Sequence, residues 1–158
     1  MIPYNVQIPS FTLAATTTAF GTIISGATRS FVISELDFQG RGTASADNEI
    51  GLYRVGTAGA TGASALTFTP DYVPNMTGTT PALAFSGTGF AAYPTQPVKG
   101  ALIHNLPLNA NGQRYFWRAW HINDVIPVPG GNNAAGSVTL MPVSGSSVVG
   151  GRIRLIEI

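Results

Sequence analysis

NGQRYFWRAWHI, residues 111–122, is the stretch of this sequence that is most informative about the fold. Its Asn-Gly start tolerates positive φ and is typical of the tight turn of a hairpin. The residues that follow alternate between two faces, one with Arg114, Phe116, Arg118, Trp120 and Ile122, the other with Tyr115, Trp117, Ala119 and His121. Because both faces carry aromatic residues, we predict a central strand over residues 113–122 that is covered on one side by the second sheet and on the other by a partner or a loop.

Similar short segments, rich in β-branched and aromatic residues and bounded by Gly and Pro, recur along the chain. They predict strands over residues 11–18, 31–38, 49–55, 66–69, 82–85, 100–105, 113–122, 137–143 and 148–158. No segment has a sustained helical periodicity. We therefore predict an all-β fold, an antiparallel β-sandwich of jelly-roll type with about 8–10 strands. It is expected to be a single domain over residues 1–158, with an extended N-terminal arm over residues 1–9 and a long low-complexity connection over residues 56–65.

Composition narrows the range of functions. The 158 residues include no cysteine, which excludes disulfides, thiol catalysis and cysteine metal sites. The net charge of +1 and the absence of long apolar runs predict no nucleic-acid partner, no membrane span and no signal peptide. Only 9% of the residues are charged, against about 25% in an ordinary soluble domain. A surface so poor in charge favours an obligate assembly that covers much of it.

The few groups able to do chemistry each have a simpler structural interpretation. Asp124 could orient His121 for base catalysis or metal binding, but we favour a strand end at His121 with a turn capped by Asp124. A cupin-type metal site needs several His and Glu ligands, and this chain has only His104 and His121 as histidines. We therefore predict no metal, no cofactor, no small-molecule substrate and no enzymatic activity.

Two acidic clusters are ambiguous in the same way. Asp47, Asn48 and Glu49 could supply oxygen ligands to Ca²⁺, although a solvated turn before a strand is the favoured interpretation. Glu35 and Asp37 alternate along a predicted strand and should share one of its faces. That face is expected to be solvated or to pair with arginine across an interface, and a hydrolytic carboxylate pair is the less favoured alternative.

The aromatic and arginine residues are the candidate binding groups. An aromatic platform for sugars is one interpretation, but side chains that alternate between faces favour core or interface anchors. As such anchors we select Tyr115, Trp117 and Trp120, together with Arg114 and Arg118. Arg114, Arg118, Arg152 and Arg154 occur in two runs that we expect to be neighbours in space. They are interpreted either as ion-pairing groups for an interface or an acidic partner, or as solvated strand faces.

Four segments in the C-terminal half carry a family resemblance: LPLNANGQRYFW (106–117), IPVPGG (126–131), LMPVSGSS (140–147) and RIRLIEI (152–158). Their succession resembles small head proteins of tailed bacteriophages, the capsid decoration or cement proteins with a jelly-roll or related sandwich fold. The resemblance implies a homotrimer on the outer capsid surface of the virion, made in the host cytoplasm, that stabilises the head by bridging major capsid protein subunits. It implies no catalytic residues. The alternative is a glycan- or receptor-binding β-sandwich module of a phage fibre.

Overall fold

The computed structural model describes residues 3–13, 16, 18–24, 29–57, 64–70, 88–92, 97–130 and 136–158. These residues form strands, turns and irregular segments, and none of them lies in an α-helix. In this part of the chain there is accordingly no helix with the length and apolar character to cross a membrane. The predicted all-β class is confirmed.

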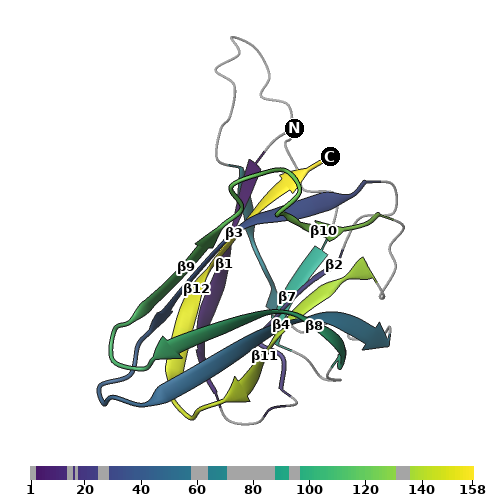
Figure 1. The fold of residues 1–158 in the computed structure, drawn as a ribbon. Coiled ribbons are helices and arrows are strands. Elements are labelled where there is room, and N and C mark those ends of the chain that lie inside the picture. The colour runs from purple at the N-terminus through teal and green to yellow at the C-terminus, as the bar shows by residue number, and fades with distance from the viewer. Residues whose placement is uncertain are drawn as a thin grey trace.

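The strands form two antiparallel sheets that pack against each other (Figure 1). Sheet A has the order β10-β3-β12-β1-β6, with β9 also paired to β3, and sheet B has the order β5-β7-β2-β11-β4-β8. The strands of sheet A are β1 (Pro3–Thr12), β3 (Phe31–Gly40), β6 (Phe68–Pro70), β9 (Arg114–Arg118), β10 (Ile126–Val128) and β12 (Val148–Glu157). Those of sheet B are β2 (Gly21–Ile24), β4 (Asp47–Thr57), β5 (Ser64–Ala65), β7 (Thr88–Ala92), β8 (Val98–Asn109) and β11 (Val138–Ser144). The predicted antiparallel β-sandwich is thus confirmed.

The core lies between the sheets and follows the period of two that a strand requires. In β1 the buried side chains are Tyr4, Val6 and Ile8, with more exposed residues between them. The other strands contribute in the same way, among them Leu36 and Phe38 of β3, Ile153 and Leu155 of β12, Ile50 and Leu52 of β4, and Leu106 and Leu108 of β8. In sheet A, the side chains that alternate with this core therefore point to the outer face of the sheet.

The Asn111-Gly112 turn forms, but it does not close a hairpin. Gly112 has the predicted positive φ of 74°. However, β8 pairs with β4 in sheet B, whereas β9 pairs with β3 in sheet A, so the turn is a corner between the sheets. The chain leaving β3 packs closely on this corner, because a Cβ on Gly40 would lie 2.2 Å from the carbonyl oxygen of Asn109. The predicted hairpin is wrong because the chain passes from sheet B to sheet A at this turn, so that β8 and β9 belong to different sheets.

Strand β9 is shorter and more peripheral than predicted. It ends at Arg118 rather than at residue 122, and among the described strands it pairs with β3 alone. Tyr115 and Trp117 pack against the core, but the opposite face of β9 is exposed, including Phe116. The prediction of a central strand is therefore wrong, and in the chain itself the outer aromatic residue lies exposed among arginines. Cover of this outer face by a partner stays a prediction.

The predicted N-terminal arm over residues 1–9 is wrong from Pro3 onward. Strand β1 lies inside sheet A, between β12 and β6, and its apolar side chains fill the core. The strand predicted over residues 11–18 instead ends at Thr12, and β2 was not predicted. The last predicted strand is confirmed as β12, between β1 and β3. The strand predicted over residues 82–85 and most of the connection over residues 56–65 lie outside the described residues.

Candidate functional site

The outer face of sheet A gathers charged and amide side chains in register across four strands. One cross-strand row is Asn5, Arg154, Glu35 and Arg118, on β1, β12, β3 and β9 in turn. The next row is Gln7, Arg152, Asp37 and Phe116 on the same strands. We call this surface the arginine face, and define it as these two rows together with Gln39, Arg114 and the adjoining Arg41. The sequence prediction that the two arginine runs are neighbours is confirmed, with β3 and its two carboxylates between them.

Glu35 is the buried centre of the arginine face. Its side chain is only 4% exposed, and its Oε1 lies 2.5 Å from Nη2 of Arg118 and 3.0 Å from Nη1 of Arg154. Nη2 of Arg152 lies farther away, 3.8 Å from Oε2. A carboxylate removed from water requires such charged partners, and the planar guanidinium group suits the task. Glu35 therefore pairs with arginine as predicted, although within one chain rather than across an interface.

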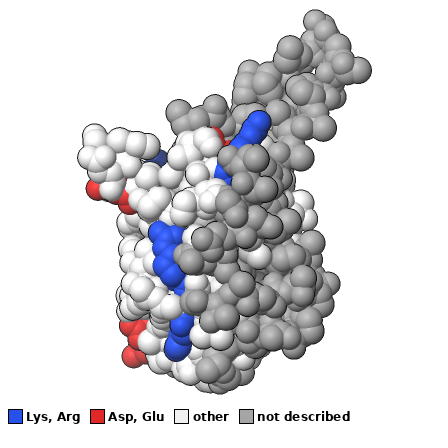
Figure 2. Space-filling model, turned by 90° about the vertical axis from the view of Figure 1, so that its right-hand side faces the viewer, with Lys and Arg blue, Asp and Glu red and all other residues white. Residues whose placement is uncertain are grey.

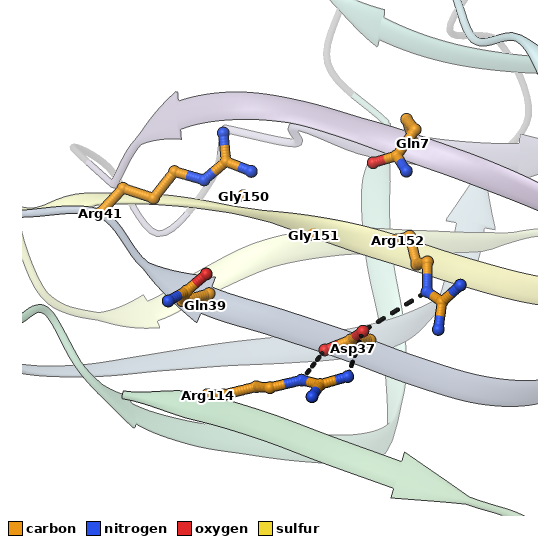
Figure 3. A pocket seen from close by; sticks show the side chains of 8 residues that line it. All are labelled: Gln7, Asp37, Gln39, Arg41, Arg114, Gly150, Gly151 and Arg152. Carbon is orange, nitrogen blue, oxygen red and sulfur yellow. Dashed lines mark hydrogen bonds and ion pairs between the residues drawn. The ribbon is translucent and has the colours of Figure 1, made fainter. Parts of the chain in front are cut away.

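Asp37 has a different set of partners. Arg114 donates two parallel hydrogen bonds to it, from Nε at 2.6 Å and from Nη2 at 2.8 Å (Figure 3). The Nε of Arg152 lies 3.4 Å from its Oδ2. The hydrogen bonding from Arg114 is the main reason that the pKa of Asp37 lies below its ordinary value, and the same pair raises the pKa of Arg114. Asp37 is thus held ionised against one fully engaged arginine and one loosely engaged arginine.

Positive charge exceeds negative charge on the arginine face. Glu35 and Asp37 are shared among four arginines of β9 and β12, and Arg41 adds a fifth positive charge. Arg41 donates a hydrogen bond of 2.5 Å to Oγ of Ser10, and no described carboxylate forms an ion pair with it. By contrast, the described residues on the side of the molecule that lies at the right in Figure 1 are largely uncharged, with a broken band of basic groups and a few acidic groups near the margin (Figure 2).

Two open grooves mark the arginine face. The first, of about 430 Å³, is lined by Gln7, Asp37, Gln39, Arg41, Arg114, Gly150, Gly151 and Arg152 (Figure 3). The second, of about 440 Å³, is lined by Pro3, Ser34, Glu35, Arg118, Ala119, Arg154 and Ile156. The first groove carries three guanidinium groups, two primary amides and one carboxylate, a set of side chains suited to binding an anionic group.

The predicted aromatic anchors divide between two environments. Tyr115 and Trp117 face inward, and the Tyr115 hydroxyl lies 2.7 Å from Nε2 of His104 on β8, which joins the neighbouring margins of the two sheets. Phe116 faces outward, 47% exposed, with the guanidinium carbons of Arg114 and Arg118 at 5.2 and 5.6 Å from its ring centroid. Trp120 is 92% exposed beyond the end of β9. Its assignment as a core anchor is therefore wrong, and its role as an interface anchor stays a prediction.

The other candidate groups do not converge. His121 lies in an exposed turn, where its backbone N–H donates to Oδ2 of Asp124, so the predicted cap by Asp124 is confirmed. The predicted strand end at His121 is wrong, because β9 ends at Arg118. Burial lowers the pKa of His104, which lies beside Tyr115 and Trp117 instead. Among the described residues, no three or more His, Cys, Asp or Glu side chains are grouped so as to hold a metal ion.

The acidic run at the start of β4 does not form the considered Ca²⁺ site. Asp47, Asn48 and Glu49 are consecutive strand residues, so their side chains alternate between faces, and only that of Asn48 is buried. Glu49 instead accepts a hydrogen bond from Nδ2 of Asn105 on the neighbouring strand. A strand separates the three oxygen ligands that a turn would have brought together.

Sequence reasoning missed three polar side chains of the first groove. Gln7 was assigned to the arm, and Gln39 and Arg41 follow the predicted end of β3. The signal for Gln7 and Gln39 was their alternation with buried neighbours, which is visible once β1 and β3 are given their full lengths. No local signal places Arg41, because its position depends on Gly150 of β12.

Comparisons with known proteins add no assignment: no family model, no curated protein and no solved structure matches this chain.

Proposed function

We propose that this protein is a capsid decoration protein of a bacteriophage, which binds as a homotrimer to the outer surface of the head and bridges major capsid protein subunits. The observation that carries the proposal is the arginine face with its exposed aromatic neighbours. Phe116 lies against Arg114 and Arg118, exposed Trp120 follows the end of β9 at Arg118, and the described lysine, Lys99, belongs to β8 of sheet B. Protein interfaces are enriched in arginine and aromatic residues and depleted in lysine, and binding energy concentrates in such groups.

The strand pairing supports the jelly-roll form of the sandwich. The first long strand pairs with the last (β1 with β12), β2 pairs with β11, β3 pairs with β10 and β9, and β4 pairs with β8. This nested order is that of one long hairpin whose two arms are rolled together into two sheets. A jelly roll has eight such strands in two Greek keys. Strands β5, β6 and β7 are then additions between β4 and β8.

The composition supports a protein that functions as part of an assembly. A charge content of 9% leaves much of the surface uncharged, and contacts with capsid subunits and with copies of itself remove such surface from water. A trimer that touches several capsid subunits gains avidity from many weak contacts. The protein acts in the virion, on the outside of the capsid, after synthesis in the host cytoplasm.

Two measurements test this function. Size-exclusion chromatography with light scattering should give about three times the chain mass of 16.4 kDa. The protein should also sediment with capsids assembled from the major capsid protein of the same phage. Replacing exposed Trp120 by Ser should weaken this sedimentation, whereas the control Leu102→Ser, at an exposed apolar residue of β8, should not. A monomer at micromolar concentration that stays in the supernatant contradicts the proposal.

A glycan-binding module of a phage fibre is the second candidate, favoured by one observation. Gln7 and Gln39 place two primary amides beside the arginines of the first groove, and amides and guanidinium groups are hydrogen-bonding partners for sugar hydroxyls. A glycan array separates the two functions. Specific binding to a sugar, together with no sedimentation on capsids, favours the fibre module.

A further inference from the structure

The first groove of the arginine face holds more positive charge than its own carboxylate neutralises. Arg41, Arg114 and Arg152 line it, and Asp37 is its single acidic residue. We call it the three-arginine groove. Arg114 is occupied, since two of its nitrogens bind both oxygens of Asp37. The surplus charge therefore resides on Arg41 and Arg152.

Both of these arginines keep hydrogen-bond donors for a further acceptor. Arg152 approaches the carboxylates only at 3.4 and 3.8 Å, beyond the usual length of a charged hydrogen bond. Arg41 is held by one hydrogen bond to a neutral acceptor, Oγ of Ser10. A guanidinium group has five N–H donors, so most of those on Arg41 and Arg152 remain available to a ligand.

A glycine positions Arg41 for this purpose. A Cβ on Gly150 would lie 2.8 Å from Cζ and 3.0 Å from Nε of Arg41, so the guanidinium group lies directly over the bare backbone of β12. Figure 3 shows Arg41 and Arg152 on opposite sides of the Gly150–Gly151 stretch, with Gln7 across the strand. Any other residue at position 150 displaces Arg41 from this place.

We propose that the three-arginine groove binds carboxylate side chains from an acidic segment of a protein partner, at Arg41 and at Arg152. The identity of that partner as a capsid subunit rests on the proposed function. Charge complementarity carries the inference, because the groove has two positive charges in excess of Asp37. Exposed Phe116, against the ring of which Arg114 lies, supplies an apolar contact of the kind that a protein surface offers.

The observations favour a protein ligand over a polyanion or a sugar. Arg114 and Arg118 both lie against the Phe116 ring, which hinders a sugar from stacking on it. The net charge of the chain is only +1, so the excess is local and does not form the extended basic track that a nucleic acid follows.

The test uses the whole protein and a defined probe, acetyl-tetra-aspartate amide, in calorimetric titrations at about 20 mM salt. We expect saturable binding that weakens as salt is raised, with no binding of the tetra-asparagine peptide. Arg41→Ala and Arg152→Ala should each weaken binding about tenfold. The matched control is Lys99→Ala, which removes the same charge from β8 in sheet B and should leave the affinity unchanged.

A second variant separates position from charge. Gly150→Ala retains every charge but pushes the flexible end of Arg41 aside, so the affinity should fall about threefold or more while the unfolding midpoint stays the same or rises. The proposal is overturned if Lys99→Ala and Arg41→Ala lose the same affinity, or if Gly150→Ala loses none. It is also overturned if the wild-type protein does not bind the peptide. Tighter binding of an acidic oligosaccharide than of the peptide overturns it too.

The same variants distinguish failure of this site from failure of the proposed function. If the peptide binds in an Arg41-dependent way but the protein never sediments with capsids, the proposed carboxylate site stands and the decoration role is refuted. If wild type and Arg41→Ala sediment equally with capsids and the peptide does not bind, the proposed carboxylate site is refuted and the decoration role stands.

Discussion

The buried carboxylate of Glu35 offers the sharpest test of how the arginine face is stabilised. Replacing Glu35 by Gln preserves its shape but removes the charge that Arg118, Arg152 and Arg154 share. Two of these arginines donate to Oε1, Arg118 at 2.7 Å from its Nε and Arg154 at 3.0 Å. Charge-assisted hydrogen bonds contribute about 1.5–3 kcal/mol each, and loss of one partner of a buried pair costs about 3–5 kcal/mol.

The arginine side chains are 33–51% exposed and can be rehydrated once Glu35 loses its charge, so the cost should lie below that of a fully buried pair. We expect Glu35→Gln to lower the free energy of unfolding by about 2 kcal/mol. Urea unfolding followed by tryptophan fluorescence measures it, because partly buried Trp117 changes environment on unfolding whereas exposed Trp120 does not.

The matched control is Glu49→Gln on β4, the same isosteric change at a carboxylate whose described partner is the neutral amide of Asn105. It should cost less than about 1 kcal/mol. A double-mutant cycle with Arg118→Met should give a coupling energy of about 1 kcal/mol or more between Glu35 and Arg118. The reasoning is refuted if Glu35→Gln costs no more than Glu49→Gln.

Three further predictions concern close packing and pH. Gly40→Ala should destabilise by about 3 kcal/mol or more in the same urea assay, because its Cβ would meet backbone atoms of the corner at Asn109; a cost under about 1 kcal/mol contradicts this. The lowered pKa of Asp37 stabilises the fold above its unfolded value of about 3.9, and this contribution is lost as pH falls through the folded value. Asp37→Asn should therefore be less stable than wild type at pH 7, by a margin that shrinks in urea titrations at lower pH; a constant margin refutes the linkage. Burial lowers the pKa of His104, so its contribution is present above about pH 6.5 and is lost as pH falls below that value. Wild type should lose more stability than His104→Gln between pH 7.5 and 5.5, and equal losses exclude His104 as the cause.

Much of the fold was predictable because alternation is a local signal. In β12, the apolar side chains Ile153 and Leu155 alternate with Arg152 and Arg154, and a strand with one buried face explains this pattern. The same logic placed Glu35 and Asp37 on one face. The prediction that arginines pair with these carboxylates was correct. Alternation places both kinds of charged side chain on the outer face of neighbouring strands, where they lie opposite one another.

What failed depended on contacts between distant segments. The Asn-Gly turn has the same backbone conformation in a hairpin and in a corner, so only the pairing of β8 with β4 and β9 with β3 separates them. Aromatic residues on both faces of β9 suggested that both faces are buried. In the structure, however, Phe116 is exposed and lies between the guanidinium groups of Arg114 and Arg118. Prolines at positions 3 and 9 concealed β1, and the place of Arg41 depends on a glycine far away in the sequence.

The pairing of β1 with β12 sets the order in which this chain can fold. Pro3 lies opposite Ile156 and Val6 opposite Ile153, so the middle of sheet A joins segments from opposite ends of the sequence. During synthesis, the edge of β1 that pairs with β12 has no hydrogen-bonding partner until β12 has left the ribosome. Such long-range pairing makes folding slow, in the range of milliseconds to seconds, and leaves the nascent chain open to aggregation meanwhile.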